Sequence, residues 1–280
     1  MNMAREIAYR LDPGLWVREV LGVTPMPWQQ QFLLARRGAF ILVLTARQVG
    51  KTTVAGWAIA HAMLFYPGSL SVIACPAQRQ SAEAVRRIRH ILLQLGVSFK
   101  SDNVYALELD NGARVLALPS DDETIRGLTV DAWIVADEAA RLEDRLIAAL
   151  HPMRARQPQA RFAMLSTAFT RTDPFWSVWS SDNPDWLRLK ATADSPGMPL
   201  RKEFLDEQRR ILGEQEYKQE YLGIPGGGLA SPFTWELFDR ATAIHIPVAP
   251  PGPAFRPPAE PPPVPVANPF RQLTVNGVLQ

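Results

Sequence analysis

The sequence predicts an α/β fold in which helices flank a mainly parallel central sheet. Short, continuous apolar runs recur as far as residue 165, as expected of parallel strands that are buried on both faces. Several of these runs end in polar residues or lead into a turn, and parallel sheets bind ligands at the carboxyl ends of their strands. The runs occupy residues 40–44, 69–75, 132–136 and 160–165.

Composition narrows the class of protein. The chain has 280 residues, of which 47% are hydrophobic and 21% charged, an ordinary globular composition. Its net charge of +2 does not by itself indicate a nucleic-acid partner. A single cysteine, Cys75, rules out a disulfide framework and a cysteine-based metal site and fits the reducing cytoplasm of a host cell. Residues 1–12 lack the apolar segment of a signal peptide, and no apolar run is long enough to span a membrane.

The stretch at residues 40–53, FILVLTARQVGKTT, is the most informative in the chain. Its five leading apolar residues predict a buried strand, TARQV predicts a short loop, and GKT opens an Ala-rich helix over residues 54–64. A GKT tripeptide alone is common by chance. Between a strand and a helix, however, it predicts a phosphate-binding loop and hence a P-loop nucleoside triphosphatase.

In such a loop, backbone N–H groups surround the phosphates of a nucleotide. Lys51 would place a positive charge at the β- and γ-phosphates of ATP, and the Thr52 hydroxyl would bind Mg²⁺. The residues expected to bind the nucleotide here are Arg47, Gln48, Gly50, Lys51, Thr52 and Thr53.

The loop departs from the standard pattern G-x-x-x-x-G-K-[ST], because Thr45 stands where glycine is expected. A β-branched residue disfavours a positive φ angle, so the backbone must enter this loop by another path. Arg47 and Gln48 inside the loop are a second departure. Arg47 could stabilise charge in the transition state, as a catalytic residue, or sense which nucleotide is bound.

The apolar run AWIVADE ends in two adjacent carboxylates, Asp137 and Glu138, about 85 residues after the phosphate loop. In nucleoside triphosphatases the first acid of such a pair holds the Mg²⁺ shell and the second polarises the attacking water. The pair alone is weak support for a catalytic site. Downstream of a phosphate loop, with a strand at 69–75 and a hairpin formed by 105–109 and 114–118 between them, it predicts a hydrolytic site of the additional-strand, catalytic-glutamate type.

Two further motifs could complete such a site. Ser166 and Thr167 follow the apolar run at 160–165, where two hydroxyls could detect the γ-phosphate. Trp28 and Gln29 lie upstream of the phosphate loop, where the amide could pair with adenine and the ring could pack on its face. Taken alone, the two residues would be better explained by a simpler interpretation, with Trp28 in the core and Gln29 on the surface.

Several helices are predicted around these motifs. Helical patterns occupy residues 12–23, a segment from 24–31 to near Gly38, 78–95, 201–212 and 214–221. The helix at 78–95 carries an arginine group that could contact nucleic acid or a neighbouring subunit, or simply be solvated: Arg79, Arg86, Arg87 and Arg89. We expect an ATPase domain at 1–240, with a helical subregion at about 199–240, and a disordered Pro-rich tail at 241–280.

From about residue 13 to residue 239, these motifs together resemble the large terminase subunit of tailed phages, the motor that packages DNA into proheads. The family likeness lies in the loop TARQVGKT, the upstream Trp-Gln, an Arg-Gly before the acidic strand, DEA, the Ser-Thr pair and the segment EYKQEYLG. It implies a Mg²⁺-dependent ATPase that translocates double-stranded DNA as a homo-oligomeric ring, together with a portal protein and a small terminase subunit.

By position, the resemblance also implies individual roles. Lys51 and Thr52 would bind phosphate and Mg²⁺, Asp137 the metal, and Glu138 the attacking water. Arg126 would be an arginine finger donated to a neighbouring subunit. The adenine contacts would come from Trp28 and Gln29, and the coupling of hydrolysis to movement from Ser166 and Thr167.

The chain departs from the family at its C-terminal end. Family members usually carry a metal-dependent nuclease domain, but the only acids here beyond Gly223 are Glu236, Asp239 and Glu260. We therefore expect no nuclease activity, because two-metal cleavage needs several convergent carboxylates. Two other interpretations remain open. The chain could be a helicase-like or other DNA-dependent ATPase, or a nucleotide-binding regulatory remnant of a terminase.

Overall fold

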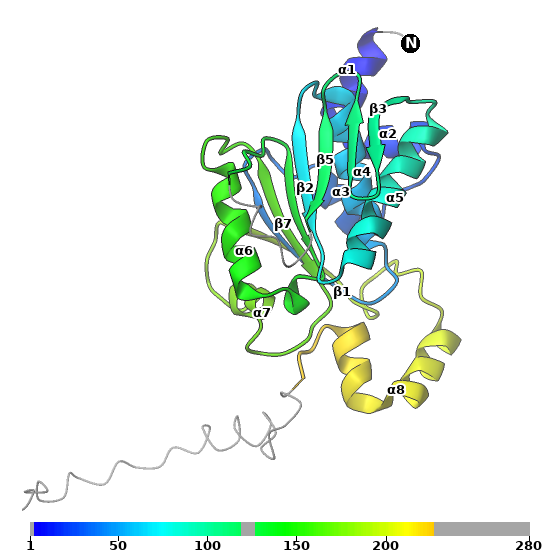
Figure 1. Cartoon of the computed structure of the whole chain (residues 1–280). Coiled ribbons are helices and arrows are strands. Elements are labelled where there is room, and N and C mark those ends of the chain that lie inside the picture. Colours follow the sequence, from blue (N-terminus) through cyan, green and yellow to red (C-terminus); the bar gives the residue numbers. More distant parts are fainter. Residues whose placement is uncertain (1–2, 119–126, 227–280) are drawn as a thin grey trace, which may run out of the picture. The chain divides into compact units, whose positions relative to one another are not determined.

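The computed structural model describes residues 3–118 and 127–226, and these are organised around one eight-stranded sheet (Figure 1). The strand order is β3-β4-β5-β2-β6-β7-β1-β8. Neighbouring strands are parallel except for β3 with β4 and β4 with β5, so the sheet is mainly parallel, as predicted. The strands are β1 Phe40–Thr45, β2 Leu70–Ala74, β3 Phe99–Asn103, β4 Ala106–Leu109, β5 Arg114–Leu118, β6 Trp133–Asp137, β7 Arg161–Ser166 and β8 Trp186–Ala191.

The order of the central strands gives the sheet its functional edge. β7 lies between β1 and β6. It is the additional strand that the sequence predicts between the phosphate-loop strand and the acidic strand. In this register Ser166 pairs with Leu44, and Asp137 pairs with Leu165. The carboxyl ends of β1, β6 and β7 therefore meet at one edge, where α/β proteins bind their ligands.

Helices cover both faces of this sheet (Figure 1). Helices α2 to α5 pack in one hydrophobic cluster, and α6, α7 and η3 pack in the other. Successive residues of β1 alternate between the clusters, since Ile41 belongs to the first and Leu42 to the second. The helices are α1 Met3–Leu11, α2 Pro13–Val20, α3 Pro27–Leu33, α4 Lys51–Phe65, α5 Gln78–Gln94, α6 Asp144–Leu150, α7 Pro174–Trp179 and α8 Lys202–Leu222, with 3₁₀ turns η2 Ala139–Arg141 and η3 His151–Arg154.

Most of the predicted elements occur within a residue or two of their expected bounds. The hairpin of β4 and β5 is antiparallel, and α5 buries Val85, Ile88 and Leu92, which the sequence placed on one face. The helix expected to end near Gly38 was too long, because α3 ends at Leu33. Thr45, expected in the loop, is the last residue of β1.

The C-terminal helical segment is broken where the sequence suggested. Gly213 has a φ angle of 77°, which interrupts α8, and Gly223 ends the helix in the left-handed conformation at 68°. Among the described residues, no helix combines the length and the apolar character needed to cross a membrane.

Some expectations fall outside the described residues. Arg126 is among them, as are the acids Glu236, Asp239 and Glu260 and the expected tail at 241–280. The domain limits at 240 and 241 and the expected lack of a nuclease therefore stay predictions.

A buried histidine fastens the N-terminal helix to the domain. His61 of α4 is 3% exposed, and its Nε2 donates a 2.8 Å hydrogen bond to the backbone carbonyl of Tyr9. Burial lowers the pKa of His61 to about 4 from its ordinary 6.5. The folded state therefore binds the proton more weakly than the unfolded state does.

We expect the contribution of His61 to stability to be complete above pH 6.5 and to be lost as the pH falls towards 4. His61→Gln should reduce the acid sensitivity of the fold, by about 2 kcal/mol between pH 7 and pH 5. Urea unfolding of both proteins at the two pH values measures this difference. Equal losses of unfolding free energy in the two proteins would contradict the assignment.

Candidate active site

The phosphate loop joins the end of β1 to the start of α4 and takes an unusual path. Gln48 and Gly50 have positive φ angles of 61° and 89°. Thr45 instead ends β1 in extended register with Ala191 of β8. The sequence predicts that the backbone enters this loop by a path other than the standard one. In the structure the two left-handed residues, Gln48 and Gly50, lie just before the start of α4 and not at Thr45.

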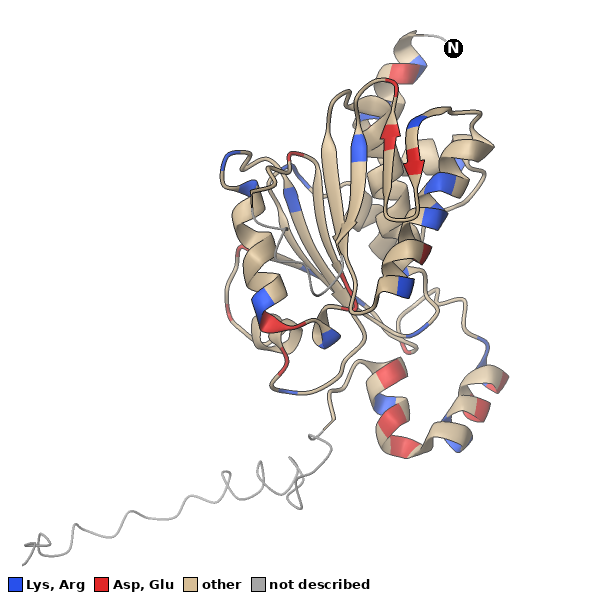
Figure 2. Ribbon diagram, in the orientation of Figure 1, with Lys and Arg blue, Asp and Glu red and all other residues tan. Residues whose placement is uncertain are grey.

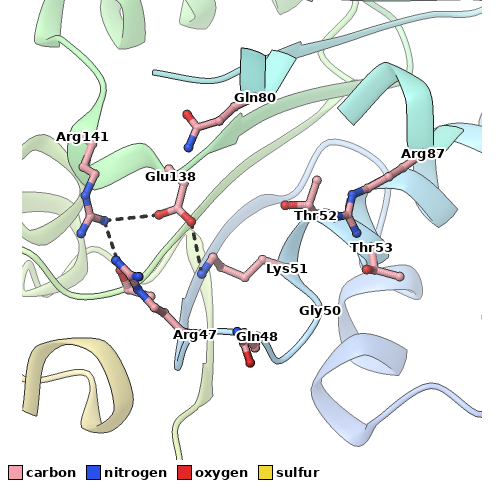
Figure 3. A pocket seen from close by; sticks show the side chains of 11 residues that line it. Arg47, Gln48, Gly50, Lys51, Thr52, Thr53, Gln80, Arg87, Glu138 and Arg141 are labelled. Atoms are coloured by element: carbon pink, nitrogen blue, oxygen red, sulfur yellow. Dashed lines mark hydrogen bonds and ion pairs between the residues drawn. The ribbon is translucent and has the colours of Figure 1, made fainter. Parts of the chain in front are cut away.

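The two predicted motifs meet at the N-terminus of α4. The Thr52 hydroxyl donates a 2.6 Å hydrogen bond to Oδ2 of Asp137, across the carboxyl end of the sheet. Lys51 Nζ lies 3.5 Å from Oε1 of Glu138. Each contact joins a residue of the phosphate motif to an acid at the end of β6 or directly after it, so the two predicted motifs form one cluster. Figure 3 shows the contact between Lys51 and Glu138.

Asp137 is buried at 4% exposure, and burial raises the pKa of its carboxyl. The Glu138 charge acts in the same direction, whereas the hydrogen bond from Thr52 favours the carboxylate. Such an acid fits a metal site, because a bound cation would offset the cost of its buried charge. No group of three or more His, Cys, Asp or Glu side chains in the described residues could hold a metal by itself. The hydroxyl and carboxylate oxygens suit Mg²⁺, which usually keeps several waters and takes further ligands from phosphates.

Glu138 has a strained backbone beside this cluster. Its φ angle is 55°, and only two non-glycine residues of the described chain have positive φ, the other being Gln48 of the phosphate loop. Left-handed non-glycine residues persist where the surrounding structure fixes them, often at functional sites. Here the conformation accompanies a carboxylate that contacts Lys51 on one side and Arg141 on the other (Figure 3).

Arg141, on η2, links the acidic strand to the predicted coupling pair. Its Nη1 lies 3.4 Å from Glu138 Oε2 and donates a 3.2 Å hydrogen bond to the Thr167 hydroxyl. The neighbouring Ser166 hydroxyl accepts a 3.2 Å hydrogen bond from the backbone N–H of Ala140. Both hydroxyls of the predicted pair therefore touch the segment that follows Glu138.

Arg47, in the phosphate loop, is held by a residue far along the chain. Its Nη2 donates a 2.8 Å hydrogen bond to Glu220 of α8, and its backbone N–H donates to the Glu220 carbonyl at 2.9 Å. The hydrogen bond to Glu220 raises the pKa of Arg47 above its ordinary value. The guanidinium group nevertheless remains accessible, with 56% of the side chain exposed.

These residues line a pocket of about 500 Å³, a size suited to a small ligand (Figure 3). All six residues predicted to bind the nucleotide in the loop line this pocket, together with Glu138 and Thr167. The full lining is Arg47, Gln48, Gly50, Lys51, Thr52, Thr53, Gln80, Arg87, Glu138, Arg141 and Thr167.

The predicted adenine contacts lie next to the loop but not in this pocket. Trp28 is buried at 5% exposure. Gln29 is 3% exposed; its amide Nε2 lies 3.5 Å from the Val49 carbonyl, and its Oε1 accepts from the backbone N–H of Met26. Gln29 thus contacts the backbone of the phosphate loop, and the contact of Trp28 and Gln29 with adenine stays a prediction.

The arginine group of α5 borders this cluster through Arg87, which lines the pocket. Figure 2 shows basic residues along that helix. Arg86 and Arg87 both pair with Glu83, and Arg89 pairs with Asp102. A second pocket of about 690 Å³ connects this helix to the two acids. It is lined by Thr52, Cys75, Ala77, Arg79, Gln80, Glu83, Arg86, Arg87, Asp137 and Glu138.

The sequence motifs gave no role to Gln80, which lines the pocket, or to Arg141 and Glu220, which form ion pairs at the site. Arg141 follows Glu138 by three positions, so the pair could have been noticed as neighbours in one helical turn. Glu220 lay in the quoted segment EYKQEYLG but carried no assigned role. Its position beside the phosphate loop depends on the path of the chain between β8 and α8, which no local pattern encodes.

Comparison with known proteins agrees with this geometry. The family described as terminase large subunit, T4likevirus-type, N-terminal, matches residues 42–240. No curated protein sequence matches the chain.

Solved structures share the fold. The large terminase ATPase domain of Thermus phage P74-26 has a TM-score of 0.63 at 19% identity, covering 76% of this chain and 98% of that one. The large terminase of the thermophilic bacteriophage D6E, in complex with ADP, has a TM-score of 0.57 at 17% identity, covering 77% of this chain and 52% of that one. The HK97 bacteriophage large terminase gives 0.55 at 18% identity, covering 75% and 50%.

The present chain thus spans about half the length of the D6E and HK97 proteins and nearly all of the P74-26 domain. The family match extends over most of the chain and includes both phosphate motifs. The chain therefore belongs to the T4-like terminase large subunit family and carries its N-terminal ATPase domain, the motor of phage DNA packaging.

Proposed function

We propose that this domain hydrolyses Mg²⁺-bound ATP at the cluster formed by the phosphate loop and the end of β6. The observation that carries the proposal is the 2.6 Å contact between Thr52 and Asp137, together with the 3.5 Å contact between Lys51 and Glu138. Thr52 and Asp137 would hold Mg²⁺, which would neutralise charge on the phosphates. Lys51 would bind the β- and γ-phosphates at the N-terminus of α4.

Glu138 would polarise the attacking water. It is 27% exposed at the side chain, so water can reach it, and Lys51 and Arg141 fix its carboxylate from two sides. A carboxylate in this position acts as a general base or orients the nucleophile. Arg47 and Arg141 line the same pocket and would stabilise the negative charge that develops on the γ-phosphate.

The remaining motif residues have supporting roles. Ser166 and Thr167 would couple the state of the nucleotide to movement, because their hydroxyls contact Ala140 and Arg141 in the segment after Glu138. Gln29 and Trp28 would contribute to adenine binding from α3. Loss of the γ-phosphate could then change the contacts of Arg141 and, through them, those of Thr167.

The reaction would drive movement of double-stranded DNA into a prohead. Family membership supports this substrate, a ring of identical subunits, and contacts with a portal protein and a small terminase subunit in the host cytoplasm. In such a ring Arg126 would reach the site of a neighbouring subunit, as its place in the sequence before the acidic strand suggests.

Glu138→Gln should keep ATP binding and lower hydrolysis by about 100-fold or more, because it removes the base but keeps the shape of the side chain. Steady-state phosphate release, measured with and without linear duplex DNA, tests this, and DNA should stimulate the wild-type protein. Glu143→Gln is the matched control, since Glu143 is an exposed carboxylate five residues along the same segment. Wild-type turnover in Glu138→Gln would show that another group activates the water.

Arg126→Ala should lower hydrolysis by about 10³-fold while leaving ATP affinity nearly unchanged, because an arginine finger acts on the transition state. Its action between subunits is tested by mixing this variant with Lys51→Ala. Some mixed interfaces then combine an intact phosphate loop with an intact finger, and activity should partly return. No recovery in demonstrably mixed assemblies would assign Arg126 a role within its own subunit.

A further inference from the structure

Glu220 is a buried carboxylate at the edge of the nucleotide pocket. Glu220 is 4% exposed. Figure 2 shows that α8 is rich in charged residues, and most of the others are exposed or half-buried. It lies 173 positions from Arg47 and 79 positions from Arg141, so only the tertiary fold brings these three residues together.

The Glu220 carboxylate pairs with two of the three arginines that line the pocket, Arg47 and Arg141. Its Oε1 accepts hydrogen bonds from Arg47 Nη2 at 2.8 Å and from Arg141 Nη2 at 3.2 Å. Its Oε2 lies 2.8 Å from Arg47 Nε. One buried carboxylate therefore joins the phosphate loop to the turn that follows Glu138.

Arg141 carries this connection to the centre of the site. The same guanidinium group contacts Glu138 and Thr167 through Nη1, and it lies 4.8 Å from the ring centroid of Phe169. Arg141 therefore has four partners, Glu138, Thr167, Phe169 and Glu220, and Glu220 is the one that lies on α8.

The negative charge of Glu220 attracts the same two arginines that a bound phosphate would attract. A buried carboxylate is costly unless it is paired, so Glu220 retains its two arginines while the pocket holds no competing anion. A γ-phosphate entering the pocket is a stronger anion with three acceptor oxygens, and arginine binds phosphate in the same bidentate way as it binds carboxylate. ADP, which lacks that group, offers much less competition.

We propose that Glu220 is a positioning residue that holds Arg47 and Arg141 beside the phosphate loop and competes with the γ-phosphate of ATP for them. The proposal rests on the proposed function, since it assumes that the pocket binds ATP. Binding of the γ-phosphate then has to weaken the ion pairs with Glu220, and this lowers the affinity for ATP. The competition sets how strongly the site discriminates ATP from ADP.

Glu220→Gln tests this directly, because glutamine keeps the size of the side chain but removes its charge. Affinities for ATPγS and ADP are measured by competition with a fluorescent nucleotide in the presence of Mg²⁺. The ratio of the two affinities should shift towards ATPγS by about tenfold, the scale of one charge-assisted hydrogen bond. A purely structural role would weaken both nucleotides or neither.

Glu216→Gln is the matched control, one turn earlier on α8 and exposed. It should leave the ratio unchanged. Arg47→Gln is a second test variant, measured in the same assay, and its result does not depend on whether the Glu220 variant folds. It should shift the ratio towards ADP, because a guanidinium group available to the γ-phosphate is lost.

The outcomes separate the two proposals. Wild-type protein that binds neither nucleotide would overturn the proposed function itself. Wild-type binding with a ratio that stays within about twofold in Glu220→Gln, or in Arg47→Gln, would overturn only the competition.

Discussion

The hydrogen bond between Thr52 and Asp137 is the contact on which the site depends. These residues are 85 positions apart and come from α4 and β6. Helix α4 follows β1, and β1 is not a neighbour of β6 in the sheet. The two residues meet because β7 lies between β6 and β1 and all three strands run parallel, so their carboxyl ends share one edge. A change of strand order would separate the hydroxyl from the acid while leaving both sequence motifs intact.

Much of this arrangement could be predicted because the relevant signals are local. Buried parallel strands appear as apolar runs, and the phosphate loop is a contiguous motif between a strand and a helix. β3 and β8 were missed, since FKSDN is polar and WLRLKA mixes charged and apolar residues. Both are edge strands, which pack on fewer neighbours and therefore need no continuous apolar run.

Glu220 and Arg141 show a different limit of sequence reasoning. A charged residue on a polar helix is usually solvated, and nothing local distinguishes Glu220 from its exposed neighbour Glu216. Its burial follows from the packing of α8 beside the phosphate loop, where Tyr221 joins the core. The result is a site in which each basic side chain of the loop already has an acidic partner, Lys51 with Glu138 and Arg47 with Glu220.

The central claim is that the phosphate loop and the end of β6 together form one Mg²⁺-ATP site. A crystal structure with Mg²⁺ and a non-hydrolysable ATP analogue tests it most directly. The account predicts the γ-phosphate beside Lys51, with Mg²⁺ bound to the Thr52 hydroxyl and Asp137 adjacent to the ion, directly or through water. Phosphates bound elsewhere, or a metal held without Thr52 and Asp137, would contradict it.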